Sequence, residues 1–134
     1  MKSRRSLLGS ATALLLSVRA KAQTPGRAPF KELARHALTG SQEGMEAILV
    51  EVTAQAGVPS AVHRHPGIVL GYVLEGEMVF AINGDAPQTV KAGGTFYEPM
   101  GALHTTGGSA KQDAPLRFLA FIVAPKGSPV TLPA

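Results

Sequence analysis

The chain has 134 residues, which is enough for one domain with a single modest core. It has no cysteine, so disulfides, thiol nucleophiles, thiolate metal sites and iron–sulfur clusters are excluded. The formal charge of +4 does not predict a surface for nucleic acid or membranes, because five of the 13 basic residues lie within positions 1–22 and leave eight bases against nine acids in the remainder.

Residues 1–22 have the layout of a secretory signal peptide. A basic start with the pair Arg4-Arg5 precedes an apolar stretch at 7–18, which is short for a membrane span, and Ala20-Lys21-Ala22 is a small-x-small cleavage site. The adjacent arginines also fit a twin-arginine signal, which exports folded proteins. We expect a periplasmic or secreted protein that is free of the membrane after cleavage, with an uncleaved anchor as the alternative.

After a lead segment at 23–44, with weak helical potential at 31–38, the sequence becomes a series of short β-rich runs separated by glycine and proline. Asn83-Gly84 is typical of a two-residue hairpin turn. This spacing, without a sustained helical period, predicts one sandwich or closed barrel at 45–124 and a tail at 125–134. The expected strands are 47–53, 60–65, 68–74, 77–82, 88–91, 95–98 and 116–123.

Two of the four histidines, His63 and His65, are two residues apart in an extended segment. Side chains at i and i+2 of a strand share a face, so both imidazoles can reach one metal ion while Arg64 points the other way. Two surface histidines that flank an arginine are the alternative. His36 lies in a polar stretch ahead of the barrel, where we expect a structural or solvated role.

The sequence around this pair resembles the two motifs of the cupin family, and the match extends over Gly57–Gly108. The resemblance implies an all-β, double-stranded β-helix (jelly-roll) barrel with the motifs on facing strands. It also implies one divalent metal ion bound by His63, His65 and His104. The matching residues are Gly57, His63-Arg64-His65 and Tyr72–Glu77 in the first motif and Gly93, Pro99-Met100-Gly101 and His104 in the second.

The sequence departs from the family pattern at Val69, where a glutamate ligand is usual, and at Gly108, where asparagine is usual. Three outcomes stay open: a three-histidine site with water in the open positions, another acid as the ligand, or a weak or absent metal. Glu98, directly before Pro99, is the best substitute acid, as a ligand or as a hydrogen-bond partner of one. An exposed glutamate at the barrel rim is the alternative. Imidazole ligands suit iron, zinc, manganese, nickel or copper.

Three functions follow from the resemblance. The first is a dioxygenase-like metalloenzyme whose small-molecule substrate chelates the metal through two neighbouring oxygens. The second is a non-catalytic periplasmic module that binds a metal or a small ligand. The third is an isomerase or lyase with Glu98 or Tyr97 as the base.

Two further expectations concern packing and assembly. We expect a homodimer that forms by strand exchange at the barrel edge. Most barrel aromatics should lie in the core or the pocket wall. These aromatics are Tyr72, Phe80, Phe96, Tyr97, Phe118 and Phe121.

Overall fold

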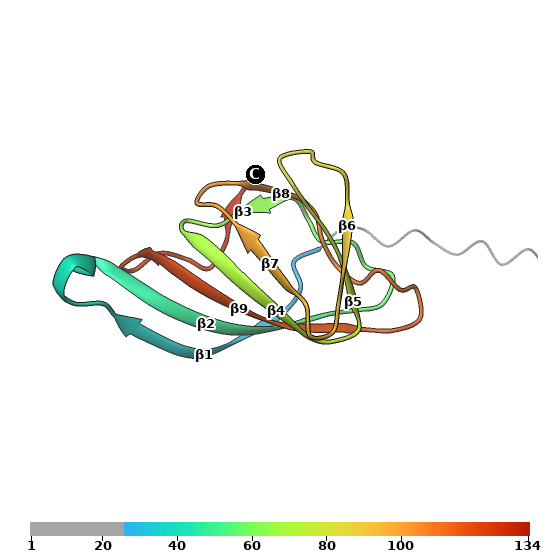
Figure 1. Ribbon diagram of the computed structural model, residues 1–134, viewed down its shortest axis with the longest axis horizontal. Coiled ribbons are helices and arrows are strands. Elements are labelled where there is room, and N and C mark those ends of the chain that lie inside the picture. Colours follow the sequence, from blue (N-terminus) through green and yellow to red (C-terminus); the bar gives the residue numbers. More distant parts are fainter. Residues whose placement is uncertain (1–25) are drawn as a thin grey trace, which may run out of the picture.

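The computed structural model describes residues 26–134, so the expected signal peptide at 1–22 lies outside the described part (Figure 1). The described residues form ten β-strands and one short 3-10 turn, and no helix among them is long and apolar enough to cross a membrane. The elements are β1 (Phe30–Ala37), η1 (Gly40–Gln42), β2 (Met45–Ala54), β3 (His63–Arg64), β4 (Ile68–Glu75), β5 (Glu77–Ile82), β6 (Gln88–Lys91), β7 (Thr95–Glu98), β8 (Leu103–Thr106), β9 (Leu116–Pro125) and β10 (Leu132–Pro133).

The strands pair into two antiparallel five-stranded sheets, which Figure 1 shows facing each other. The large sheet has the order β1-β2-β9-β4-β7, and the small sheet has the order β10-β3-β8-β5-β6. Successive strands cross between the sheets, so that segments far apart in the sequence become neighbours. The predicted all-β jelly-roll barrel is confirmed.

The core lies on the inner face of the large sheet, where every second side chain points inward. β2 and β9 pair along their whole length, from Met45 opposite Pro125 to Ala54 opposite Leu116. Ile48 and Ile122 face each other in this ladder and are fully buried. Burial of these two side chains together with the other apolar residues of the core provides most of the driving force for folding.

The weak helical potential at 31–38 is overruled, because this segment forms the edge strand β1. Its residues are nearly all exposed, so burial does not hold it. β1 pairs with β2 from Phe30 opposite Val52 to Ala37 opposite Glu46, which gives the outer backbone groups of β2 hydrogen-bond partners. Arg35 adds an ion pair to the buried Glu46. Long-range pairing therefore decides the structure of this segment.

The expectation for the aromatic residues is correct for only part of the set. Phe80 and Phe96 are buried, whereas Tyr72, Tyr97 and Phe121 are exposed. The exposed three alternate with buried neighbours and so point to the outer face of the large sheet. The sequence could not distinguish the two faces because both are apolar.

The Asn83-Gly84 turn forms as predicted, although the connection it belongs to is longer than two residues. Both residues have positive φ, of 52° and 82°, and Asp85 N–H donates to the Ile82 carbonyl. Strand pairing resumes only at Gln88 opposite Phe80. The Asn83 side-chain oxygen accepts a hydrogen bond from the Leu103 N–H at 2.9 Å, which ties this turn to β8.

Candidate metal centre

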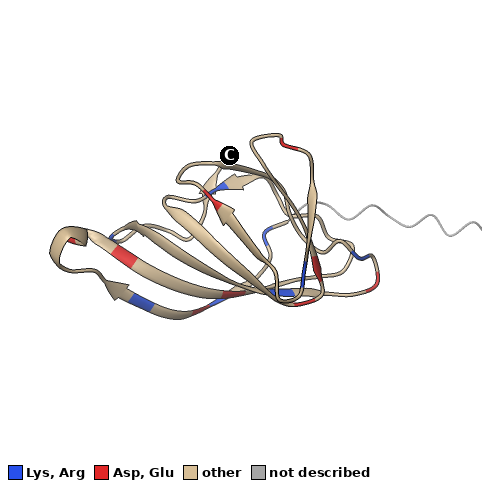
Figure 2. Ribbon diagram, in the orientation of Figure 1, with Lys and Arg blue, Asp and Glu red and all other residues tan. Residues whose placement is uncertain are grey.

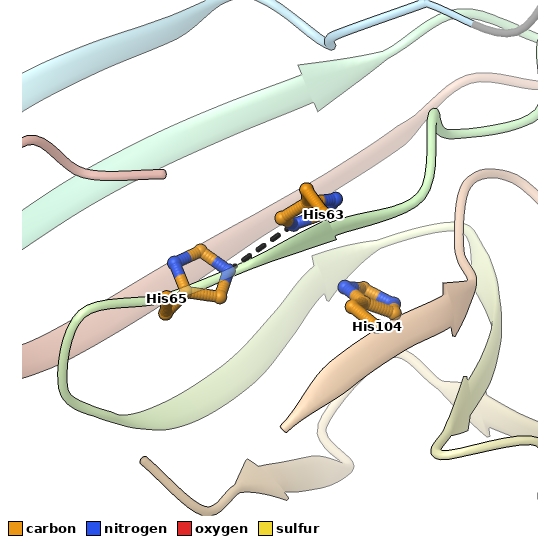
Figure 3. A group of neighbouring side chains, drawn as sticks. All are labelled: His63, His65 and His104. Carbon is orange, nitrogen blue, oxygen red and sulfur yellow. Dashed lines mark hydrogen bonds between the residues drawn. The ribbon is translucent and has the colours of Figure 1, made fainter. Parts of the chain in front are cut away.

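The three imidazoles predicted as ligands come together at one end of the barrel interior (Figure 3). His63 lies in β3 and His65 directly after it, and His104 lies in β8 opposite His63. One ring nitrogen from each residue lies within 4.8 Å of the others, a spacing that could hold a metal ion. The ring centroids of His63 and His104 are 4.8 Å apart, and those of His63 and His65 are 4.9 Å apart.

Backbone carbonyls set the tautomers of two of these rings. Nδ1 of His63 donates to the Ala61 carbonyl at 2.8 Å, and Nδ1 of His65 donates to the Val130 carbonyl at 2.7 Å. Both Nε2 atoms are then acceptors, yet they face each other at 3.2 Å. Two lone pairs at this distance require a proton or a cation between them, and metal-binding histidines are held in this way by their other ring nitrogen.

Glu98 brings a carboxylate into the same space from the large sheet. Its side chain is 2% exposed, so the alternative of a glutamate at the rim is wrong. Oε1 lies 3.4 Å from Nδ1 of His104, and Oε2 lies 3.8 Å from Nε2 of His65. Glu98 Oε2 and both His104 ring nitrogens are buried without a hydrogen-bond partner among the described residues. A cation bound by one His104 nitrogen and by the carboxylate would give two of these atoms a partner.

Strand register explains how Glu98 reaches this place. β4 and β7 pair with Val69 directly opposite Glu98, so the two side chains project from adjacent strands on the same face of the sheet. Val69 occupies the position where the family pattern places a glutamate. The carboxylate therefore enters the site from the strand beside the usual one. Tyr97, the next residue along β7, is 49% exposed and points away from the site.

Comparisons with known proteins identify the family and the fold of the chain. The model of the Cupin domain family matches residues 49–122, more than half of the chain. The chain belongs to the cupin family. No curated protein sequence matches this cupin significantly.

Solved structures share the fold of this cupin. An uncharacterized conserved protein with a double-stranded β-helix domain from Klebsiella pneumoniae is 20% identical, with a TM-score of 0.62 over 84% of this chain and 89% of that one. A cupin-like protein from Thermotoga maritima is 21% identical, with a TM-score of 0.56 over 74% of this chain and 75% of that one. At these identities the likeness establishes the fold alone.

Burial sets the charge preferences of the site. It raises the pKa of Glu98 to about 7 and lowers the pKa values of His65 and His104 to about 4, because each group loses the water that would solvate its charged form. A divalent cation would reverse this preference for Glu98 and would match the neutral histidines. His36 lies on the exposed strand β1, opposite Ala47 and outside the site, as expected.

A cavity of about 280 Å³ extends from the site into the barrel of this cupin. Its walls include Val50, Val52 and Phe118 from the large sheet. Its lining also includes the lead segment Gly26–Phe30. The sequence of this lead segment did not indicate a role in the cavity wall.

The sequence analysis also missed two groups that position the site histidines of this cupin. The first is the Val130 carbonyl, which fixes the His65 ring, and the second is Gly107. A Cβ at Gly107 would lie 2.8 Å from Nε2 of His104, so only glycine leaves room for this ring. A backbone carbonyl has no sequence signal, whereas the Gly107-Gly108 pair next to His104 was visible.

Proposed function

We propose that this cupin is a metal-dependent enzyme that acts on a small molecule. One divalent ion would be held by His63, His65 and His104, with Glu98 as the fourth ligand in place of the family glutamate. The observation that carries the proposal is the histidine cluster, in which one ring nitrogen from each of His63, His65 and His104 lies within 4.8 Å of the others. Glu98 Oε2 and the ring nitrogens of His104 are also buried without a hydrogen-bond partner among the described residues. Burying such atoms without a partner is costly, and a cation would satisfy the carboxylate oxygen and one nitrogen of His104.

The charge of this ligand set favours an anionic substrate. Three neutral imidazoles and one carboxylate offset one of the two charges of a divalent ion. A six-coordinate ion would keep two positions for a chelating substrate or for oxygen. With iron(II) bound, the site would supply oxygen chemistry of the dioxygenase type to a chelating small molecule.

The residues of the chain itself would have distinct tasks in this reaction. The Ala61 and Val130 carbonyls would keep the Nε2 lone pairs of His63 and His65 directed at the ion. The apolar walls would exclude water from the substrate. When Glu98 is not bound to the ion, its carboxylate could accept a proton. A lyase or isomerase would require Glu98 to act as a general base in this way.

A non-catalytic binding module is the second candidate, and one observation favours it. Among the cavity-lining residues, the only titratable side chain besides the four proposed ligands is Arg27, which is exposed. A reaction that needs a separate acid or base in the cavity would therefore find none in the lining. Capture of a metal ion or of a chelating ligand needs no acid or base.

Metal analysis combined with turnover tests these proposals. The purified protein is analysed for bound metals, loaded with iron(II), and assayed for oxygen uptake with diketones, thiols and catechols. We expect stoichiometric metal in the wild type, loss of metal in His63→Ala, and retention of metal in His36→Ala, the matched control outside the site. Loaded protein without turnover favours the binding module, and wild-type protein that takes up no metal contradicts both.

We also propose that the chain is exported to the periplasm or secreted. The support is the order of basic, apolar and small residues in 1–22, which lie outside the described part of the structure. Cell fractionation of the wild type is compared with Arg4→Lys/Arg5→Lys. A twin-arginine signal loses export in this variant, whereas a general secretory signal keeps it. A wild-type chain that stays in the cytoplasm would contradict the proposal.

A further inference from the structure

The strand registers define the inner face of the large sheet, and all residues of this face given below line the cavity except Ile48, Gly71 and Val73. Side chains that lie opposite one another across β7, β4, β9 and β2 form a row. The row at the candidate metal centre contains one carboxylate followed by hydrocarbon side chains. The next two rows, deeper along the strands, contain only apolar residues or glycine. The rows are Glu98, Val69, Ile122 and Ile48; then Phe96, Gly71, Ala120 and Val50; then Val73, Phe118 and Val52.

This wall cannot form hydrogen bonds with a ligand except at Glu98. The facing wall adds Met78, which is also buried. The other polar side chains that line the cavity are Arg27, Gln55, Ser60 and Thr131, all of them more exposed than the metal-site carboxylate. A polar group placed midway along a bound ligand would therefore lose its hydrogen bonds to water without replacement.

We infer that the substrate or ligand of this cupin has a monoanionic chelating head and an apolar body, such as one aromatic ring or a short branched chain. This inference rests on the proposed metal site and adds the ligand class to it. An apolar cavity of ~150 Å³ accepts benzene, and this cavity is about 280 Å³. One ring together with its chelating head therefore fits. Small dicarboxylates, sugars and polyols do not match the wall.

A series of hydroxamic acids with the same chelating head tests the ligand class. The protein is loaded with nickel(II), a redox-stable probe metal, and titrated by calorimetry with acetohydroxamate, benzohydroxamate and the pyridine analogue isonicotinohydroxamate. We expect benzohydroxamate to bind about 10- to 100-fold more tightly than acetohydroxamate, the range expected for burial of one phenyl ring. The pyridine analogue should bind severalfold more weakly than benzohydroxamate, because its ring nitrogen finds no donor.

A matched pair of nearly isosteric variants locates the effect in the cavity. Val52→Thr places a hydroxyl on the inner wall, and Val79→Thr places one on the outer side of β5, where Val79 lies opposite Thr89 and outside the cavity lining. We expect Val52→Thr to weaken benzohydroxamate severalfold without changing acetohydroxamate, and Val79→Thr to change neither. Nickel-loaded protein that binds all three compounds equally overturns the ligand class. Failure to take up any metal overturns the proposed function instead.

A separate observation concerns the outer face of the same sheet. The outward row at the middle of β7, β4, β9 and β2 contains Tyr97, Leu70, Phe121 and Leu49. Leu70 is 54% exposed. The flanking rows add Tyr72 with Leu119, and Ile68 with Val123 and Ala47. We call these nine residues the outer apolar face.

The nine residues of the outer apolar face include no charged side chain. Figure 2 shows no charged residue in the middle of β4 or β9. At one end, Arg117 lies 3.3 Å from Glu51 and 3.4 Å from Glu75. A charged partner would find no charged side chain among these nine residues, whereas a second copy of the same apolar surface would match them.

We propose that the occupant of the outer apolar face is a second copy of this chain, related by a two-fold axis. The half-exposed rings of Tyr72, Tyr97 and Phe121 by themselves present on the order of 300 Å². The aliphatic side chains between them add an area of the same order, which brings the face close to the ~800 Å² per partner of a stable interface. In this proposal the two copies pack face to face, whereas the expectation from the sequence was strand exchange at the barrel edge.

Light scattering after size exclusion tests this interface. Leu70→Glu places a charge in the middle of the face, and Leu33→Glu is the matched control on β1, where Leu33 is 42% exposed. We expect a dimer for the wild type and for Leu33→Glu, and a monomer for Leu70→Glu. A monomeric wild type overturns the proposal. A dimer that survives Leu70→Glu also overturns it and favours pairing at a sheet edge.

Discussion

The two sheets of this cupin divide stability and chemistry between them. β2 and β9 of the large sheet have ten residues each and pair in continuous register, whereas β3 and β10 of the small sheet have two residues each. All three candidate histidine ligands lie on or directly beside the small sheet, and the large sheet contributes only Glu98. The pairing of such short strands contributes little stability. The small sheet should therefore depend on the bound metal, and the large sheet should not.

The largest expected effect comes from opening a void in the large sheet. Ile48→Ala removes a fully buried side chain at the centre of β2, so the free energy of unfolding should fall by about 2–5 kcal/mol. Chemical denaturation measures this, and Met45→Ala, on the outer side of the same strand and away from the outer apolar face, is the control with a smaller loss. Equal losses for the two variants would mean that the inner face is not the main core.

Metal should stabilise the protein through the small sheet. At a free metal concentration of 100 times Kd, the gain is about 2.7 kcal/mol. His63→Ala should abolish this gain while the metal-free variant keeps most of its stability, because His63 is only partly buried. The check is Tm with added metal and with chelator. A wild-type Tm that responds to neither metal nor chelator would contradict the expectation that the small sheet depends on bound metal.

The pH dependence of the metal-free protein should reveal the cost of burying Glu98. Its pKa rises from 4.5 to about 7 on folding, so the folded state binds more protons between these values and stability falls as pH increases. Metal-free Glu98→Gln should therefore be more stable than the wild type at pH 8, on the order of 2 kcal/mol. The difference should disappear near pH 4.5, where the carboxyl is protonated in the folded protein.

With metal present, the order of the two proteins should reverse. Glu98→Gln loses the proposed carboxylate ligand, so its metal-dependent gain in stability should be smaller than that of the wild type. Denaturation at pH 5 and pH 8, each with metal and with chelator, separates the two effects. A difference between the metal-free variants that does not change with pH would show that folding does not raise the pKa of Glu98.

The sequence was most informative where burial and turn residues agree. The runs 77–82, 88–91 and 95–98 were predicted with the bounds that β5, β6 and β7 have, because alternation between glycine-rich turns leaves little freedom. β1 was missed because its exposed side chains show no burial pattern and only its pairing with β2 makes it a strand. Its structure depends on a partner distant in sequence.

The candidate site was predictable in its residue types but not in its register. Spacing identified His63 and His65, and the second motif identified His104. The inward direction of Glu98 follows from its alternation with Tyr97, but its position opposite Val69 depends on how β4 pairs with β7. A shift of this pairing by one residue would place the carboxylate outside. Strand register is a long-range property that one sequence does not display.

The smallest expected effect concerns the bond that holds β8 in place. The Asn83 side chain accepts a hydrogen bond from the backbone N–H of Leu103, the residue before His104. The backbone of Asn83 has a φ of 52°, a conformation that glycine also adopts readily. Asn83→Gly keeps the turn and removes the acceptor, so stability should fall by about 0.5–1 kcal/mol and metal affinity by a few-fold. Asn83→Asp keeps an acceptor and should retain the affinity. Calorimetric titration with nickel(II) distinguishes the two variants. If Asn83→Gly loses stability but binds metal like the wild type, then β8 does not need this bond to present His104, and the small sheet is more rigid than its short strands indicate.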